Sequence, residues 1–393
     1  MLYRALRVSL LSLYSLPARW GVALVVVICI AGASGVLVSM LAMADGFQQT
    51  FRKAGRADRI IVLSTGELSE PGSSISRDQL PVLLDAPGLA RLANGKPAAS
   101  VERFTISPLP QRERGKEGNL VVRGVGMDVL AVRPEVHLTA GRMFQAGLRE
   151  LIVGRAAQAH FPALGMGAQV SLSGVDWTVV GVFESGGSAL ESEAWGEVEA
   201  VMSAYNQSSY SSLTAMLEST ASFQAYKDAV TSDPALSHTP QHESDYFAAQ
   251  GGTLSAAMQI IGYVVSAIMG LGALFAAVNT MYASIESRSV EIATLRAIGF
   301  EATPIVLSVL LECILLCGAG AALGGGVAYL LFNGYTVSTL STASFSQVSF
   351  AFNVTPALLG QGALSASVIG LLGGLFPALH AVRVPVIDGL RAA

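Results

Sequence analysis

Residues 284–299 read SIESRSVEIATLRAIG, a short charged segment between two long apolar runs. The segment is too polar to lie in lipid and too short to be a domain of its own. Two membrane spans joined by a short charged helix on one membrane face are typical of a lever that a soluble partner pushes. We therefore expect residues 285–302 to form a helix that contacts a soluble protein.

The composition indicates a membrane protein with one soluble part. The chain is 52% apolar and 13% charged, well below the charged share of about 25% in soluble domains. Most of its lysines and arginines lie between residues 45 and 250. A charged block between apolar segments predicts a soluble domain inserted between membrane spans.

Four segments are long and apolar enough to cross a bilayer, which takes roughly 20 residues. The predicted spans are residues 20–43, 254–284, 303–332 and 357–382. The first is too long for a removed signal peptide, so we interpret it as a retained anchor. The predicted fold class is a polytopic α-helical membrane protein with four transmembrane helices and a large α+β extracytoplasmic domain, residues 44–253, between the first and second.

The positive residues near the span ends predict the orientation. Cytoplasmic loops carry an excess of Lys and Arg, and residues 333–356 carry no charge at all. The arginines that set the orientation are Arg4, Arg7, Arg19, Arg288, Arg296, Arg383 and Arg391. We expect both termini and residues 285–302 in the cytoplasm, and residues 44–253 and 333–356 outside it. Residues 1–19 have the pattern of an interfacial helix, and residues 383–393 form a tail.

The residue patterns within the outer domain predict alternating strands and helices, and from residue 244 a helix that runs directly into the second span. Predicted strands are residues 59–63, 119–125, 150–153, 170–173, 176–183 and 212–217, and predicted helices are residues 77–84, 155–160, 192–205 and 221–230. The domain has no cysteine, so its own core must hold it together.

The sequence predicts no catalytic, cofactor or metal site and no nucleic-acid partner. It has no phosphate-binding loop, so we expect no ATP hydrolysis by the chain itself, and it has no zinc-protease or serine-hydrolase motif. The five histidines lack metal-ligand spacing. An acidic cluster is interpreted as a solvated helix face, with a cation or basic partner as the alternative; it comprises Glu184, Glu191, Glu193, Glu197 and Glu199.

One acid and three cysteines lie inside the predicted spans, and we interpret them as structural. Glu312 lies within the third span, where an acid is costly and usually has a polar partner. A structural hydrogen bond between helices is favoured over a proton relay, because no second buried acid or base accompanies it. The three cysteines, Cys29, Cys313 and Cys317, also lie in spans and are interpreted as small apolar filler rather than metal ligands.

Three C-terminal motifs resemble those of MacB/FtsX-type (type VII) ABC transporter permeases. They are residues 279–299, which read NTMYASIESRSVEIATLRAIG; Glu312 with Gly320 and Gly324; and residues 376–391, FPALHAVRVPVIDGLR. The resemblance covers nearly the whole chain and extends to lipoprotein-releasing permeases, and we expect the ATPase to be a separate polypeptide rather than a fused domain. It implies a multi-pass inner-membrane protein with a periplasmic core domain, which transmits movement and is not itself an enzyme.

The resemblance also implies partners and site residues. Two copies of a separate cytoplasmic ABC ATPase would dock on the coupling helix, and a second permease chain would complete a homodimer or heterodimer in the membrane lipid. The coupling residues would be Glu286, Arg288, Glu291, Arg296 and Gly299. The alternative for this segment is an ordinary loop helix with an Arg288–Glu291 ion pair.

Three functions remain open at this stage. The first is efflux of a periplasmic substrate with a membrane-fusion adaptor and an outer-membrane channel. The second is release of lipoproteins, and the third is regulation of a cell-wall hydrolase without transport.

Overall fold

The computed structural model describes residues 20–112, 117–299, 301–341 and 346–383. The predicted interfacial helix at residues 1–19 and nearly all of the predicted tail lie outside them. The chain divides into two units, each with its own packing. The helical unit takes its residues from Met1–Asp45, Ala256–Tyr335 and Phe352–Ala393, and the sheet unit consists of Gly46–Ser255 and Thr336–Ala351.

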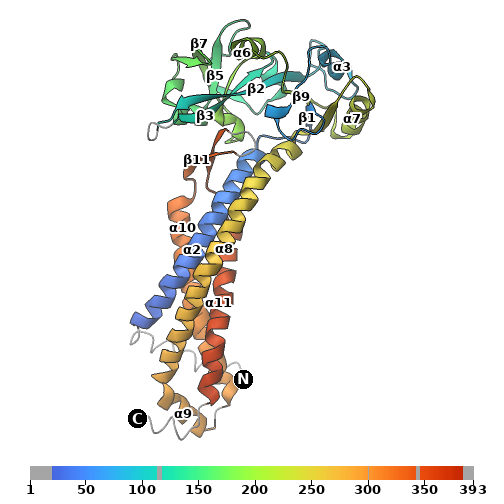
Figure 1. Ribbon diagram of the computed structural model, residues 1–393. Helices are drawn as coiled ribbons and strands as arrows, with labels where there is room; N and C mark the ends of the chain where they lie inside the picture. Colours follow the sequence, from blue (N-terminus) through green and yellow to red (C-terminus); the bar gives the residue numbers. More distant parts are fainter. Residues whose placement is uncertain (1–19, 113–116, 300, 342–345, 384–393) are drawn as a thin grey trace. The chain divides into compact units, whose positions relative to one another are not determined.

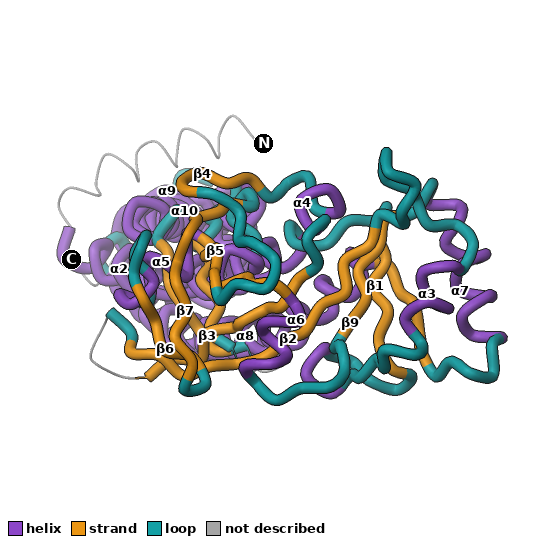
Figure 2. The backbone as a smooth tube through the Cα atoms, turned by 90° about the horizontal axis from the view of Figure 1, so that it is seen from above, coloured by secondary structure: helices purple, strands orange, loops and turns teal. Residues whose placement is uncertain are grey.

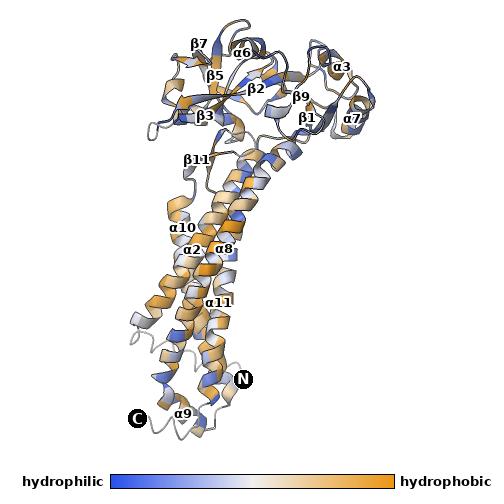
Figure 3. Ribbon diagram, in the orientation of Figure 1, coloured by the Kyte–Doolittle hydropathy of each residue, from blue (hydrophilic) through white to orange (hydrophobic). Residues whose placement is uncertain are grey.

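Four long apolar helices confirm the predicted spans (Figure 1). They are α2 (Trp20–Arg52), α8 (Glu243–Glu286), α10 (Ala302–Phe332) and α11 (Pro356–Arg383), and each is long and apolar enough to cross a membrane. Figure 3 shows apolar residues along most of their lengths. As predicted, one helix runs from the end of the soluble domain through the second span, because α8 is continuous from Glu243 to Glu286.

Small residues bring the helices of the helical unit close together. A Cβ atom added at Gly320 of α10 would lie 2.8 Å from the Val27 carbonyl oxygen of α2, and one added at Gly324 would collide with the Ala31 carbonyl. Close backbone approach of this kind is a main source of helix association in lipid. Cys313 and Cys317 are fully buried in the core of this unit, which agrees with their interpretation as filler.

The sheet unit is built on one mixed sheet with the strand order β10-β1-β9-β2-β3-β8-β5-β7-β4, and β6 pairs with β7 (Figure 2). Its strands are β1 (Arg59–Ser64), β2 (Ala99–Pro110), β3 (Glu117–Val125), β4 (His137–Gly141), β5 (Glu150–Gly154), β6 (Gln169–Leu172), β7 (Val175–Glu184), β8 (Glu193–Glu197), β9 (Ser212–Met216) and β10 (His238–His242). Its short helices are α3 (Leu80–Asp85), α4 (Val129–Val132), α5 (Arg155–His160), α6 (Val198–Ala204) and α7 (Phe223–Ser232).

Two apolar clusters hold this sheet. One surrounds Trp177 on β7 and includes residues of β3, β5 and α5. The other surrounds Tyr226 on α7 and includes residues of β1 and β9. Both aromatic side chains are fully buried, so the unit has the core that a cysteine-free domain needs.

Most of the predicted elements of this unit are present, but the helix predicted over residues 192–205 is wrong in its first half. Residues Glu193–Glu197 form strand β8, and only Val198–Ala204 is helical. Strand β8 lies between β3 and β5 in the sheet, with residues 193–196 buried. Pairing on both sides therefore overrides the local helix preference of this glutamate-rich stretch.

The uncharged segment between α10 and α11 forms a hairpin rather than a plain loop. Its strands are β11 (Thr336–Leu340) and β12 (Gln347–Ala351), and they belong to the sheet unit. The Ser349 N–H donates to Ser192 Oγ at 3.0 Å, and the Gln347 side chain is 2.8 Å from His160 Nε2. The buried Phe350 ring packs edge-on against Phe47, with 5.3 Å between the ring centroids. The hairpin is thus an integral part of the sheet unit.

Candidate functional site

The predicted coupling segment contains the short helix α9 (Ser289–Ala297), which follows α8 after a turn at residues 287 and 288. The helix ends before Gly299, whose φ of +97° is the left-handed conformation expected of a glycine that ends a helix. Within the helix, Ile292 and Ala293 are buried, so α9 packs along one side.

The other side of α9 faces outward with mixed chemistry. Glu291 has 66% of its side chain exposed, and Ile298, just past the helix, is 73% exposed. Glu286, Thr294 and Ala297 are also exposed, whereas Arg296 is half-buried.

Arg288 does not belong to this outward ridge. Only 12% of its side chain is exposed, with Nε 3.1 Å from Glu291 Oε2 and Nη1 3.5 Å from Glu312 Oε2. The predicted Arg288–Glu291 pair is therefore present, and Glu312 has the polar partner that its place in the span demands. The contact supports the structural interpretation of Glu312 over a proton relay.

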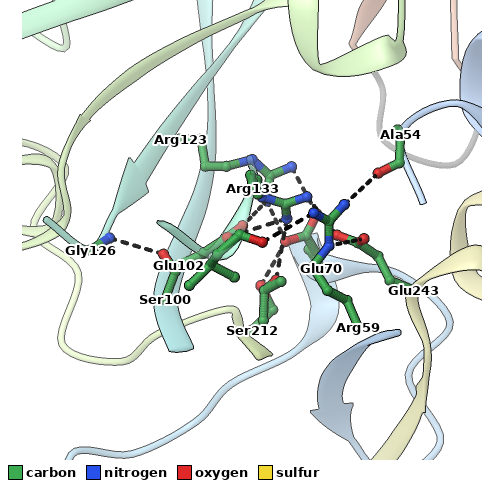
Figure 4. Close-up of polar contacts among 12 residues, drawn as sticks. Ala54, Arg59, Glu70, Ser100, Glu102, Arg123, Gly126, Arg133, Ser212 and Glu243 are labelled. Carbon is green, nitrogen blue, oxygen red and sulfur yellow. Dashed lines mark hydrogen bonds and ion pairs between the residues drawn. The ribbon is translucent and has the colours of Figure 1, made fainter. Parts of the chain in front are cut away.

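A second polar site, which the sequence did not reveal, lies inside the sheet unit (Figure 4). Acids and arginines alternate through it in the order Glu193, Arg123, Glu102, Arg133, Glu243, Arg59 and Glu135, and Glu70 joins at Arg123. We call these eight residues the buried charge chain. The three arginines are at most 2% exposed, so their charges must be met by neighbouring acids rather than by water.

Arg123 on β3 is the hub of this chain. Its guanidinium donates two hydrogen bonds to Glu193, at 2.7 and 2.9 Å, and two to Glu70, at 2.6 and 3.0 Å. A further bond reaches Glu102 at 2.8 Å. Planar, two-pronged pairing of this kind is the strongest that arginine makes with carboxylates. The three acids come from different elements, so Arg123 fixes their relative positions.

Glu243, the first residue of α8, lies further along the buried charge chain, between Arg133 and Arg59. The carboxylate of Glu243 accepts from Arg133 at 2.5 Å, from Arg59 at 2.6 Å and from the backbone N–H of Arg56 at 3.1 Å. Arg59 lies on β1 and Arg133 follows α4. The start of α8 is therefore bound to the sheet through buried charge-assisted hydrogen bonds.

Burial and pairing act in opposite directions on the acids of the chain. Burial alone would raise the pKa of Glu70, but the charge and hydrogen bonds of Arg123 outweigh it and bring the pKa below its usual 4.5. Burial and the adjacent Arg59 oppose each other in the same way at Glu135, whose pKa is also lowered. Both acids are thus held in their charged form.

The acidic cluster predicted as a solvated helix face is corrected by these contacts. Glu193 is buried in the charge chain, and Glu191 accepts the backbone N–H groups of Ser185 and Gly187, each at 2.7 Å. Glu197 caps α6, and Glu184 and Glu199 pair with exposed arginines. The five residues do not share a helix face, because they are spread over β7, a 3-10 helix, β8 and α6. Among the described residues, no group of three or more His, Cys, Asp and Glu could hold a metal ion.

Comparison with known proteins agrees with the C-terminal motifs. Residues 23–233, more than half of the chain, match the MacB-like periplasmic core domain, and residues 263–386 match the FtsX-like permease C-terminal domain. The macrolide export ATP-binding/permease protein MacB of Psychrobacter cryohalolentis is 24% identical over 318 residues, which cover 75% of this chain and 47% of that protein. Its counterpart in Campylobacter jejuni is 34% identical over 137 residues, or 35% of this chain and 19% of that protein.

The chain spans less than half the length of these two relatives. Two solved structures are also similar. The extracellular domain of the noncanonic ABC-type transporter YknZ from Gram-positive bacteria is 16% identical, covering 47% of this chain and 100% of that one with a TM-score of 0.36. The periplasmic region of MacB from Actinobacillus actinomycetemcomitans is 12% identical, covering 53% and 98% with a TM-score of 0.38.

The family predicted from the motifs is therefore confirmed. A MacB-like core domain is followed by an FtsX-like segment, and the four long helices occur where that arrangement requires them. The chain belongs to the MacB/FtsX-type permeases.

Proposed function

We propose that the chain is the permease subunit of an ABC transporter and transmits movement rather than hydrolysing ATP. A separate cytoplasmic ABC ATPase binds α9, and closure of two ATPase copies moves α9. The movement passes along the helices to the sheet unit on the periplasmic side of the inner membrane, with the termini in the cytoplasm. Two permease chains, identical or different, complete the assembly.

The observation that carries this proposal is the continuity of α8. The helix begins at Glu243, inside the buried charge chain, and ends at Glu286, just before α9. Its 44 residues correspond to roughly 66 Å at a rise of about 1.5 Å per residue. The helix is hydrogen-bonded to the sheet unit at its first residue and leads into α9 after its last. A continuous helix of this kind can transmit a movement of α9 to the sheet unit.

The outward ridge of α9 is proposed as the docking surface. Glu286, Glu291 and Thr294 supply its polar part and Ile298 its apolar part, while half-buried Arg296 lies at its edge. An exposed apolar residue such as Ile298 gains free energy when a partner removes it from water. Gly299 ends the helix and so sets the limit of the surface.

Export from the periplasm is the proposed outcome of the cycle. The curated relatives are named for macrolide export, which favours efflux over lipoprotein release or hydrolase regulation. An adaptor and an outer-membrane channel would then complete the path.

Charge reversal and polar substitution on α9 test the proposal. We expect Glu291→Lys and Ile298→Asp to weaken copurification of the ATPase by about tenfold or more, since like charges or buried polar groups at a contact cost several kcal/mol. Stimulation of ATP hydrolysis by the permease should fall in parallel. The matched control is Asp85→Lys, which reverses an exposed acid at the end of α3 in the sheet unit and should retain the partner. Full copurification and stimulation with both α9 variants would leave α9 as an ordinary loop helix.

A further inference from the structure

The turn between α8 and α9 does not by itself define the direction of α9. The Arg288 N–H donates to the Ile285 carbonyl at 3.0 Å, and Ser287 Oγ donates to the Ser284 carbonyl at 2.9 Å. Both contacts return to α8. They end that helix without holding α9 against a neighbour.

Two side chains do hold α9 to α10. Ile292 packs in the same apolar cluster as Ile305 and Val309, but apolar contact has no preferred direction. Arg288 reaches Glu312, within the first half of α10, with 3.5 Å between Nη1 and Oε2. A planar guanidinium constrains its partner's position far more than an apolar contact does.

We propose that Arg288 and Glu312 form a positioning pair that fixes the direction of α9 against α10. A push on α9 then moves α10 together with α8. This inference rests on the proposed coupling function and adds the second helix that takes up the movement.

The exposed fractions of Arg288, Glu291 and Glu312 show which of the two acids contributes more to holding Arg288. The Arg288 and Glu312 side chains are 12% and 8% exposed, whereas Glu291 is 66% exposed. Removing one member of a buried pair leaves the other charge uncompensated, and an exposed pair contributes little. Glu312 is therefore the buried partner of Arg288, whereas Glu291, 3.1 Å from Arg288 Nε, keeps most of its side chain exposed to a binding partner.

The direction of α9 can be measured without any partner. Spin labels at Ala283→Cys on α8 and Thr294→Cys on α9 replace exposed residues, in a chain whose three native cysteines are changed to alanine. We expect a narrow distance distribution in the parent chain and a broadened or shifted one in Arg288→Gln and Glu312→Gln. The control Glu301→Gln should leave the distribution unchanged.

Coupling to the ATPase provides the second readout. Arg288→Gln and Glu312→Gln should retain the copurified ATPase but reduce its stimulation by about three- to tenfold, the usual size of effects from residues that couple two sites. The exchanged pair Arg288→Glu with Glu312→Arg should recover part of that loss. Glu291→Lys should behave differently, because it loses the partner itself.

Several outcomes would overturn the proposal. Unchanged distances in both glutamine variants would show that the pair does not position α9. Stimulation that falls only in proportion to the ATPase retained would make Arg288 a docking residue. If the glutamine variants do not insert into the membrane, Glu312→Asp can replace them, because it keeps the charge but shortens the side chain. An unchanged distance between the two spin labels in that variant would also contradict the proposal. If the wild-type chain binds no ATPase, the proposed function fails while the distances still decide the pair.

Discussion

The sheet unit and the helical unit both have apolar cores, but they differ in what they add to them. The sheet unit buries three arginines and four glutamates in one chain of ion pairs that links distant strands and the start of α8. The helical unit relies on glycines that bring backbones into contact, with Arg288 and Glu312 joining α9 to α10. In the sheet unit, directional ion pairs fix the positions of distant strands relative to one another. Among the spans, close packing at glycines fixes the positions of the helices.

The largest loss of stability is expected when Arg123, the hub of the buried charge chain, is replaced. Arg123→Ala leaves Glu70, Glu102 and Glu193 without their shared cation, which should lower the free energy of unfolding of the sheet unit by about 3–5 kcal/mol. Urea titration followed by tryptophan fluorescence measures this, since Trp177 and Trp195 are buried in that unit.

The matched control for that variant is Arg155→Ala. Arg155 pairs with Glu184 at the surface, where its side chain is 68% exposed, so the loss should be below about 1 kcal/mol. Equal losses in the two variants would mean that burial of the charges is irrelevant to stability.

Filling the close contact between α2 and α10 should also lower stability, but by less. In Gly324→Ala the new methyl group meets the Ala31 carbonyl of α2, and we expect overpacking to cost about 1–3 kcal/mol. Gly326→Ala on the same helix meets nothing within 4 Å and should be neutral. Thermal aggregation of the detergent-solubilised chain distinguishes the two, and a neutral Gly324→Ala would contradict close packing of α2 and α10.

The smallest effect concerns pH. Burial lowers the pKa of His238 on β10 below its usual 6.5, so the unfolded chain binds its proton first as the pH falls. The contribution of neutral His238 to stability is thus complete above pH 6.5 and lost as the pH drops through its folded pKa. His238→Phe should flatten the decline between pH 7 and 5 in urea titrations. The loss that begins near pH 4.5 should remain, because the unfolded chain then binds protons at Glu70 and Glu135 while the folded chain, with its lowered pKa values, does not yet bind them. An unaltered decline in His238→Phe would show that His238 does not contribute to it.

The spans were predictable because a bilayer demands long apolar runs, and the motif singled out Arg288, Glu291 and Gly299, whose coupling role stays a prediction. The buried charge chain was not, because its members lie as far apart as Arg59 and Glu243 and only the strand pairing brings them together. The apolar run of β3 could have flagged Arg123, because this arginine stands among valines on a strand that is buried continuously from Leu120 to Val125. The β11–β12 hairpin was missed because its partners, such as Ser192 and Phe47, lie far earlier in the chain.

That hairpin has a consequence for how the protein is made. The sheet unit needs residues 336–351, which reach the ribosome exit only after α8 and α10 have been synthesised. At about 5–20 residues per second, the chain between Ser255 and Thr336 takes on the order of 4–16 s to produce. Throughout that interval the surface that receives Phe350 is open to water. The sheet unit is therefore completed only after the chain of α8 and α10 has been made, although most of its residues precede them.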